Sequence, residues 1–193
     1  MEEKISIVIR LHSILEDMGL PWLAIGNLAL YLYGIIDNFP DIKILVGEDY
    51  HETIHKVFSR NFTVIHEPHY GETKFYAYNV SSYIIGLNLD LHVFSGIVIK
   101  IDKHAISPSF TDILRHSKNI PLHGIKIPVP PLEWLCLYYY AHPTKEEIFN
   151  LVANKLKETG INFVLFEEFL QYLTEDDKTT ILNSLLKHIR KNF

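Results

Sequence analysis

The sequence predicts an α+β (mixed α/β) fold, in which a mixed sheet flanked by helices is followed by a C-terminal helical region. Three observations support this prediction. Residues 3–18 place apolar side chains on one face at helical spacing. Residues 62–101 contain strand-length runs rich in Val, Ile, Phe and Tyr. From Leu132 onward the apolar spacing is helical almost without interruption.

Glycine and proline residues mark the ends of the first predicted helix and strand. We expect the helix over 3–18 to end at Gly19, and Pro21 prevents it from resuming. Residues 22–25 then form a short buried strand, and Gly26–Asn27 form a turn. The chain therefore enters its core through a strand and a glycine turn.

The next three elements are a helix, a strand and a helix. We expect residues 28–33 to form a short helix that ends at Gly34. Residues 42–46 are almost continuously apolar, which is typical of a central strand. Asp49 and Glu52 have the spacing of an N-terminal capping box, so we expect a further helix to begin at Asp49.

Strand-like runs dominate the middle of the chain. We expect a tight turn at Ser95–Gly96 and a small hairpin over 120–129 that turns at His123–Gly124. The expected strands cover residues 62–65, 74–78, 83–94 and 97–101.

Prolines at the end of this region mark a boundary, so we expect an α/β core over residues 1–130 and a helical region over residues 131–193 that packs on it. Within the helical region, Thr144 and Glu147 suggest a second capping box. The expected helices cover residues 132–140, 144–159, 161–173 and 174–190.

Composition limits the function classes. The chain has 193 residues, a net charge of −5 and a single cysteine, Cys136. The acidic balance gives no indication of a broad basic surface for nucleic acid, although it leaves a local patch open. One cysteine excludes an intrachain disulfide and a cysteine zinc cluster.

The N-terminus opens on an acidic pair, Glu2 and Glu3, and lacks the basic start and the apolar stretch of a secretory signal. No apolar run approaches the roughly 18 to 20 residues that span a membrane. We therefore expect a cytoplasmic protein without a membrane partner. Gln171 is the only glutamine and isoleucine is abundant, a composition that fits a thermophile.

Two apolar strands carry acidic side chains. Asp41 and Lys43 alternate onto one side of the strand over 42–46, and Asp90 and His92 do the same on a later strand. Carboxylates in apolar strands are costly unless they are paired or bind a metal. Carboxylates that converge on neighbouring strands can hold Mg²⁺ for phosphoryl transfer.

On these residues the sequence resembles the nucleotidyltransferase superfamily of the polymerase β type, especially its small bacterial and archaeal members. The resemblance rests on the glycine turn and helix over 26–34, on Asp41 as the first carboxylate of an Asp-x-Asp motif, and on Asp90 as the third acid. The segment 127–135 resembles the entry to the helical part of that family.

This resemblance implies transfer of a nucleotidyl group from an NTP to an acceptor. Gly26 and Asn27 would cradle phosphate, and Asp41 and Asp90 would hold Mg²⁺. The sequence departs from the family pattern at Lys43, which stands where the second carboxylate belongs. It departs again at Tyr138 and Tyr139, where the family has a lysine.

Lys43 leaves three interpretations open. It can pair with Asp41 or Asp90 and leave the protein catalytically impaired, or it can hold a nucleotide phosphate directly without metal. Ordinary metal-dependent transfer is the third. The first two are compatible with a non-catalytic protein that binds a nucleotide or a partner protein on the same fold.

Residues 51–55 match a zinc peptidase motif, H-E-x-x-H, in which His51 and His55 would bind zinc and Glu52 would act as general base. We favour a structural interpretation, since Glu52 already serves the expected capping box. A third ligand would have to be Glu67, His69 or Glu72, which lie in an expected loop and not in a following helix.

Overall fold

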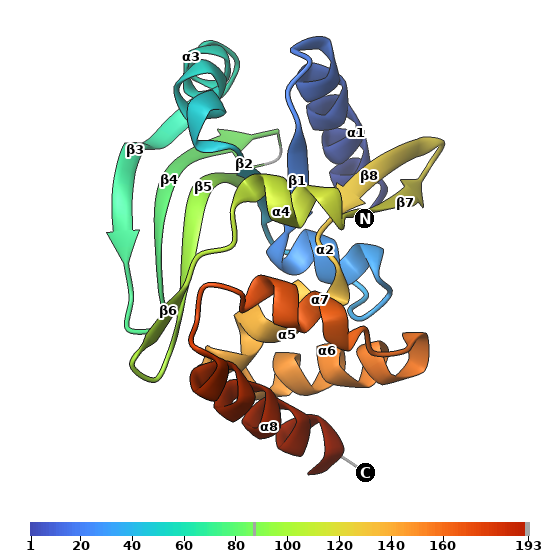
Figure 1. The fold of residues 1–193 in the computed structure, drawn as a ribbon. Helices are drawn as coiled ribbons and strands as arrows, with labels where there is room; N and C mark the ends of the chain where they lie inside the picture. The colour runs from blue at the N-terminus through green and yellow to red at the C-terminus, as the bar shows by residue number, and fades with distance from the viewer. Residues whose placement is uncertain (87, 192–193) are drawn as a thin grey trace. The chain divides into compact units, whose positions relative to one another are not determined.

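The computed structural model describes residues 1–86 and 88–191 (Figure 1). These residues divide into two compact units. The first unit comprises residues 1–71, 78–97 and 109–130. The second unit comprises residues 72–77, 98–108 and the chain from Pro131 onward. The strands β3, β4 and β5 contribute residues to both units.

A six-stranded mixed sheet has the strand order β1-β2-β5-β4-β3, and β6 pairs with β5. β1 pairs with β2 antiparallel, β2 with β5 parallel, and β5 with β6 antiparallel. The mixed sheet and its helices confirm the predicted fold class. The strands are β1 Trp22–Ile25, β2 Ile42–Val46, β3 Thr63–Glu72, β4 Tyr76–Ile85, β5 Leu89–Ile101 and β6 His104–Ile106.

The prediction of a tight turn at Ser95–Gly96 is wrong, because β5 runs unbroken from Leu89 to Ile101. Gly96 has a φ of 63°, a left-handed conformation that glycine adopts without steric cost. A glycine in that conformation inside a strand is typical of a local kink. The sequence signal for a turn therefore marked an irregularity within one long strand.

The helices of the first unit have buried apolar faces. In α1 this face is formed by Ile5, Val8, Leu11 and Leu15. The helices are α1 Glu2–Asp17, α2 Gly26–Leu32, α3 His51–Asn61 and α4 Phe110–Arg115, with the short 3-10 helix η1 Glu48–Tyr50 before α3. A hairpin of β7 Lys118–Leu122 and β8 Ile125–Val129 turns at His123–Gly124, as predicted.

The predicted capping box at Asp49 is wrong. Asp49 lies inside η1, and α3 begins at His51 without a side-chain cap. A 3-10 turn satisfies part of the backbone at this helix entrance, so the carboxylate is not needed as a cap.

In the second unit, α5 is buried on nearly every side, as its apolar sequence predicts. Its Glu133 is only 5% exposed and accepts a hydrogen bond of 3.0 Å from the backbone N–H of Asn162. The capping box predicted at Thr144 is wrong, because Thr144 belongs to η2 and the next helix begins at Glu146. The helices are α5 Leu132–Tyr140, α6 Glu146–Thr159, α7 Phe163–Phe169 and α8 Glu175–Lys191, with η2 Pro143–Lys145 before α6.

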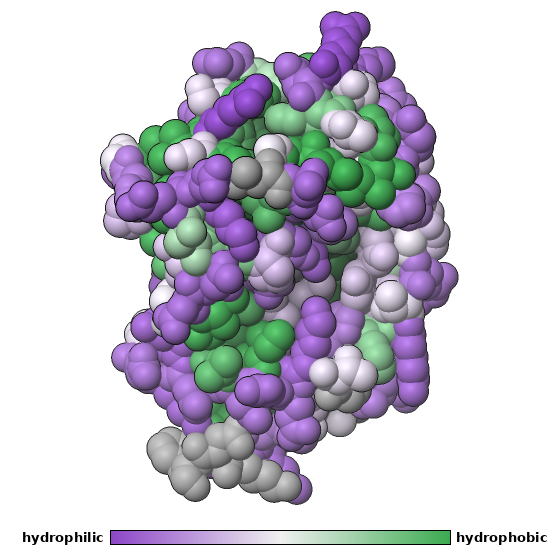
Figure 2. All heavy atoms as spheres, turned by 180° about the vertical axis from the view of Figure 1, so that it is seen from behind, coloured by the Kyte–Doolittle hydropathy of each residue, from purple (hydrophilic) through white to green (hydrophobic). Residues whose placement is uncertain are grey.

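The surface carries scattered apolar side chains. On the face in Figure 2, hydrophobic areas alternate with hydrophilic ones. Among the described helices none is both long and apolar enough to cross a membrane.

Candidate functional site

The glycine turn brings the start of α2 against β2. Gly26 has a φ of 60°, and a Cβ atom at this position would lie 3.0 Å from Cδ of Lys43. Ile25 is the antiparallel partner of Lys43 in the sheet, which explains this proximity. The turn therefore places the Lys43 side chain directly over Gly26.

Both carboxylate oxygens of Asp41 have partners. Asn27 donates a hydrogen bond from Nδ2 to Oδ1 over 2.8 Å, and Nζ of Lys43 lies 3.1 Å from Oδ2. The two charged side chains are only 26% and 18% exposed, so solvent screens this ion pair less than a surface pair. The predicted residues Gly26, Asn27, Asp41 and Lys43 thus form one cluster.

The parallel register brings β5 alongside this cluster. Ile42 pairs with Leu91 and Lys43 pairs with His92. Asp41 precedes β2 by one residue, and extending the same register by one residue places it opposite Asp90. Since paired residues of neighbouring strands point to the same face, Asp41, Lys43, Asp90 and His92 share one face of the sheet.

His92 was not among the predicted site residues. Its Nδ1 lies 2.8 Å from Oγ of Ser82 on β4. Burial lowers the pKa of His92, and the charge of Lys43 lowers it further, whereas Asp41 and Asp90 act in the opposite direction. The alternation with Asp90 marked the position of His92, but no local signal marked Ser82, which reaches the cluster only through strand pairing.

The donor set does not fit a divalent metal ion. Lys43 places an ammonium group at the carboxylate that would bind the metal, and the other oxygen of Asp41 already accepts from Asn27. A cation at this position repels a second one. In the part of the chain that the structure describes, no group of three or more His, Cys, Asp or Glu side chains could hold a metal ion.

The two histidines of the H-E-x-x-H match belong to a different polar cluster. Nε2 of His51 lies 3.1 Å from Oγ of Ser81, which also accepts a 3.1 Å hydrogen bond from Tyr83. Nδ1 of His55 lies 2.8 Å from the Tyr83 hydroxyl, and its Nε2 lies 2.8 Å from Oε2 of Glu67. The ring nitrogens of His51 and His55 therefore take part in a chain of hydrogen bonds that links α3 to the sheet.

Burial of His51 lowers its pKa, and the neighbouring His55 lowers it further. Burial likewise raises the pKa of Tyr83. Both shifts favour the neutral forms, which suit hydrogen bonding inside the protein.

The fold is similar to solved nucleotidyltransferase structures. TM1012 of Thermotoga maritima, a candidate nucleotidyltransferase, aligns with a TM-score of 0.63 at 21% identity over 82% of this chain and 92% of its own. The lincosamide antibiotic adenylyltransferase LnuA aligns at 0.53 and 11% identity over 76% of this chain and 94% of its own. ANT(2")-Ia, solved with adenylyl-2"-tobramycin, aligns at 0.56 and 13% identity over 88% of this chain and 98% of its own.

The chain therefore has the nucleotidyltransferase fold, which is the fold that the sequence resemblance implied. The sequence matches no protein-family model and no curated protein.

Proposed function

We propose that this protein is a non-catalytic relative of the nucleotidyltransferases that binds a nucleotide at the Gly26–Asn27 turn without a divalent metal. The observation that carries the proposal is the 3.1 Å contact between Nζ of Lys43 and Oδ2 of Asp41. Lys43 thereby supplies the positive charge that a metal ion supplies at a carboxylate pair.

The local charges predict weak nucleotide binding. Asp41 and Asp90 contribute two negative charges to the cluster, and Lys43 contributes one positive charge. A nucleotide phosphate would therefore depend on Lys43, whose side chain lies over Gly26. The carboxylate of Asp90 would oppose its binding.

The test is calorimetric titration with each NTP, with and without Mg²⁺. We expect the dissociation constant to be insensitive to Mg²⁺. Affinity that requires Mg²⁺ would contradict the proposal and would favour catalysis. Absence of binding under both conditions would also contradict it, and would favour a scaffold that binds a partner protein.

Asp90→Asn gives the sharper comparison, because the two mechanisms predict opposite signs. In a metal-independent site, loss of this carboxylate removes repulsion and should strengthen NTP binding by about twofold to fivefold. In a metal-dependent site, the same substitution removes a ligand and should weaken binding in the presence of Mg²⁺. Asp37→Asn, at a carboxylate elsewhere in the first unit, is the matched control.

Lys43→Asp tests the placement of the site. If Asp41 and Asp90 converge as the register indicates, the substitution should create Mg²⁺ binding that the natural protein lacks. Lys56→Asp changes the same charge on α3 and should leave Mg²⁺ affinity unchanged. Equal Mg²⁺ affinity of Lys43→Asp and the natural protein would show that the placement is wrong.

Nucleotidyl transfer is the competing function, favoured by the fold and by the adjacent register of Asp41 and Asp90. It would require Lys43 to leave Asp41. Mg²⁺-dependent release of pyrophosphate from an NTP, abolished in Asp41→Asn, would establish transfer and overturn the non-catalytic proposal.

A further inference from the structure

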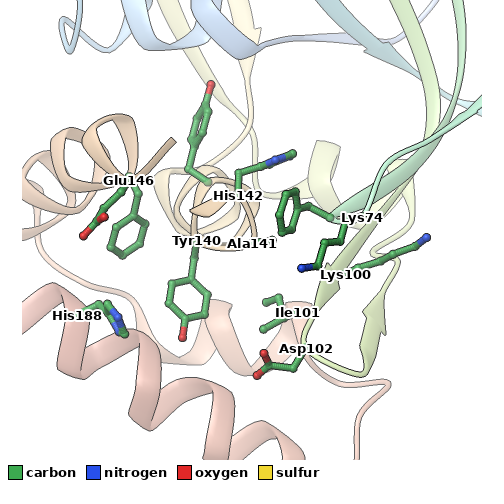
Figure 3. A pocket seen from close by; sticks show the side chains of 12 residues that line it. Lys74, Lys100, Ile101, Asp102, Tyr140, Ala141, His142, Glu146 and His188 are labelled. Carbon is green, nitrogen blue, oxygen red and sulfur yellow. The ribbon is translucent and has the colours of Figure 1, made fainter. Parts of the chain in front are cut away.

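The second unit contains a pocket of about 450 Å³ that shares no residue with the Asp41 cluster (Figure 3). All its lining residues come from this unit: the strand segments near Phe75 and Ile101, the end of α5, the start of α6, and α8. This volume lies within the range of small-molecule sites.

Aromatic side chains form much of the pocket wall and hold one another in place. The Tyr140 hydroxyl lies 2.6 Å from Oγ of Ser184, and its ring centroid lies 5.6 Å from that of Phe149 and 5.5 Å from that of His188. Nδ1 of His188 lies 2.8 Å from the Ser184 carbonyl oxygen. These contacts fix the wall in advance, which reduces the entropic cost of binding a planar apolar group.

The pocket also holds charges of both signs that do not neutralise each other. Lys100 is paired with Glu72. By contrast, neither Lys74 nor Asp102 has an ion-pair partner within residues 1–86 and 88–191. In Figure 3 the carboxylate of Asp102 turns toward the pocket. Lys74 lies on the strand side of the same pocket, with Nζ 5.7 Å from the centroid of the Phe75 ring.

A second carboxylate lines the pocket, and its position has a local explanation. Glu146 lies in the first turn of α6, where the positive end of the helix dipole stabilises an acidic side chain. Asp102 is exposed and lies in the turn between β5 and β6 with a φ of 52°, a conformation that aspartate adopts more readily than most residues.

We infer that this pocket binds a small zwitterion with an aromatic or apolar body, whose ammonium group contacts Asp102 and whose carboxylate contacts Lys74. The aromatic wall accommodates the body of the ligand, and Lys74 and Asp102 each receive a counter-ion. This site is independent of the nucleotide proposal.

Three probes with one skeleton test the inference: L-phenylalanine, 2-phenylethylamine, which lacks the carboxylate, and 3-phenylpropionate, which lacks the amine. Binding is followed by titration calorimetry, and by NMR chemical shifts of the His188 ring. We expect L-phenylalanine to bind most tightly and to shift His188. Failure of all three probes to bind would overturn the inference, and so would equal affinities, which would indicate an uncharged apolar cavity.

Two variants test which charged group of the ligand each pocket residue contacts. Asp102→Asn keeps a residue that tolerates positive φ. It should weaken the binding of L-phenylalanine and of 2-phenylethylamine by about fivefold, and should leave the binding of 3-phenylpropionate unchanged. Lys74→Met should weaken the binding of L-phenylalanine and of 3-phenylpropionate to a similar extent. Asp37→Asn and Lys56→Met, both in the first unit, are matched controls. Unchanged affinities in both pocket variants would contradict the assignment.

Discussion

The Asp41 carboxylate in the first unit has a partner on each oxygen, whereas two charged side chains at the pocket of the second unit have no ion-pair partner among the described residues. Asp41 has Asn27 on one oxygen and Lys43 on the other. Lys74 and Asp102 line one pocket and have no ion-pair partner among the described residues. The region that carries the sequence resemblance therefore contains an ion pair, Asp41 with Lys43, whereas the pocket contains charges without ion-pair partners.

Charges with an ion-pair partner and charges without one should affect stability and ligand binding differently. Removing one partner of a partly buried ion pair destabilises the fold, because the other charge is left without a partner, and a ligand that binds either charge must displace the other. A charge at a pocket that lacks a partner contributes little to stability and is available to a ligand. Substitution of Asp41 should therefore have a large effect on unfolding, whereas substitution of Lys74 or Asp102 should affect binding at the pocket with little effect on unfolding.

Asp41→Ala should have the largest effect on stability. It leaves the Lys43 ammonium and the Asn27 amide without their partner in a partly buried position, and should lower the free energy of unfolding by about 1 to 3 kcal/mol. Urea denaturation measures the loss. The double variant Asp41→Ala/Lys43→Met should lose less than the sum of the two single variants, and strict additivity would show that the pair is not coupled.

Gly26→Ala should lower the free energy of unfolding by about 1 to 2 kcal/mol, because alanine is strained at positive φ and because its Cβ atom would displace the Lys43 side chain. Gly34→Ala is the matched control, because Gly34 has a φ of 66° and a Cβ atom added there would have no neighbour within 4 Å. The control should show only the backbone cost. Equal losses of Tm in the two variants would mean that Lys43 does not pack closely over Gly26.

Acid should destabilise the first unit through His51. Its pKa in the folded protein is lowered from 6.5 by burial and by His55, so the folded state favours the neutral ring. The resulting stability is present above pH 6.5 and is lost as the pH falls through the folded pKa. His92 has a shift of the same sign.

In urea denaturation between about pH 7.5 and 5, His51→Gln should therefore flatten the dependence of stability on pH. His123→Asn, in the exposed hairpin turn, should leave the slope unchanged. The same slope in His51→Gln and the natural protein would assign the acid sensitivity to other groups.

Asp102→Asn should have the smallest effect on stability, within about 0.5 kcal/mol of the natural protein. Its carboxylate has no ion-pair partner in the described parts of the chain, and asparagine tolerates its φ of 52°. Thermal unfolding checks this directly. A loss above about 1 kcal/mol would show that Asp102 supports the fold, and would remove the contrast with Asp41.

Much of the fold could be predicted from local sequence signals. β1 and β2 have the predicted bounds, since their apolar runs end at clear polar or glycine signals. The capping boxes at Asp49 and Thr144 were wrong because short 3-10 turns precede both helices. The turn at Ser95–Gly96 was wrong because pairing with neighbouring strands kept β5 continuous through a left-handed glycine.

By itself the sequence determined the class of fold, and it placed Asp41 with Lys43 and Asp90 with His92 on one side of their strands, because alternation along a strand fixes which side chains share a face. Only the tertiary structure decided which charges meet. Whether Lys43 pairs with Asp41, whether Ser82 reaches His92, and whether Lys74 and Asp102 line one pocket depend on strand register and on packing between segments far apart in the chain. Local sequence cannot specify those distances, because they are set by the lowest free energy of the whole folded chain.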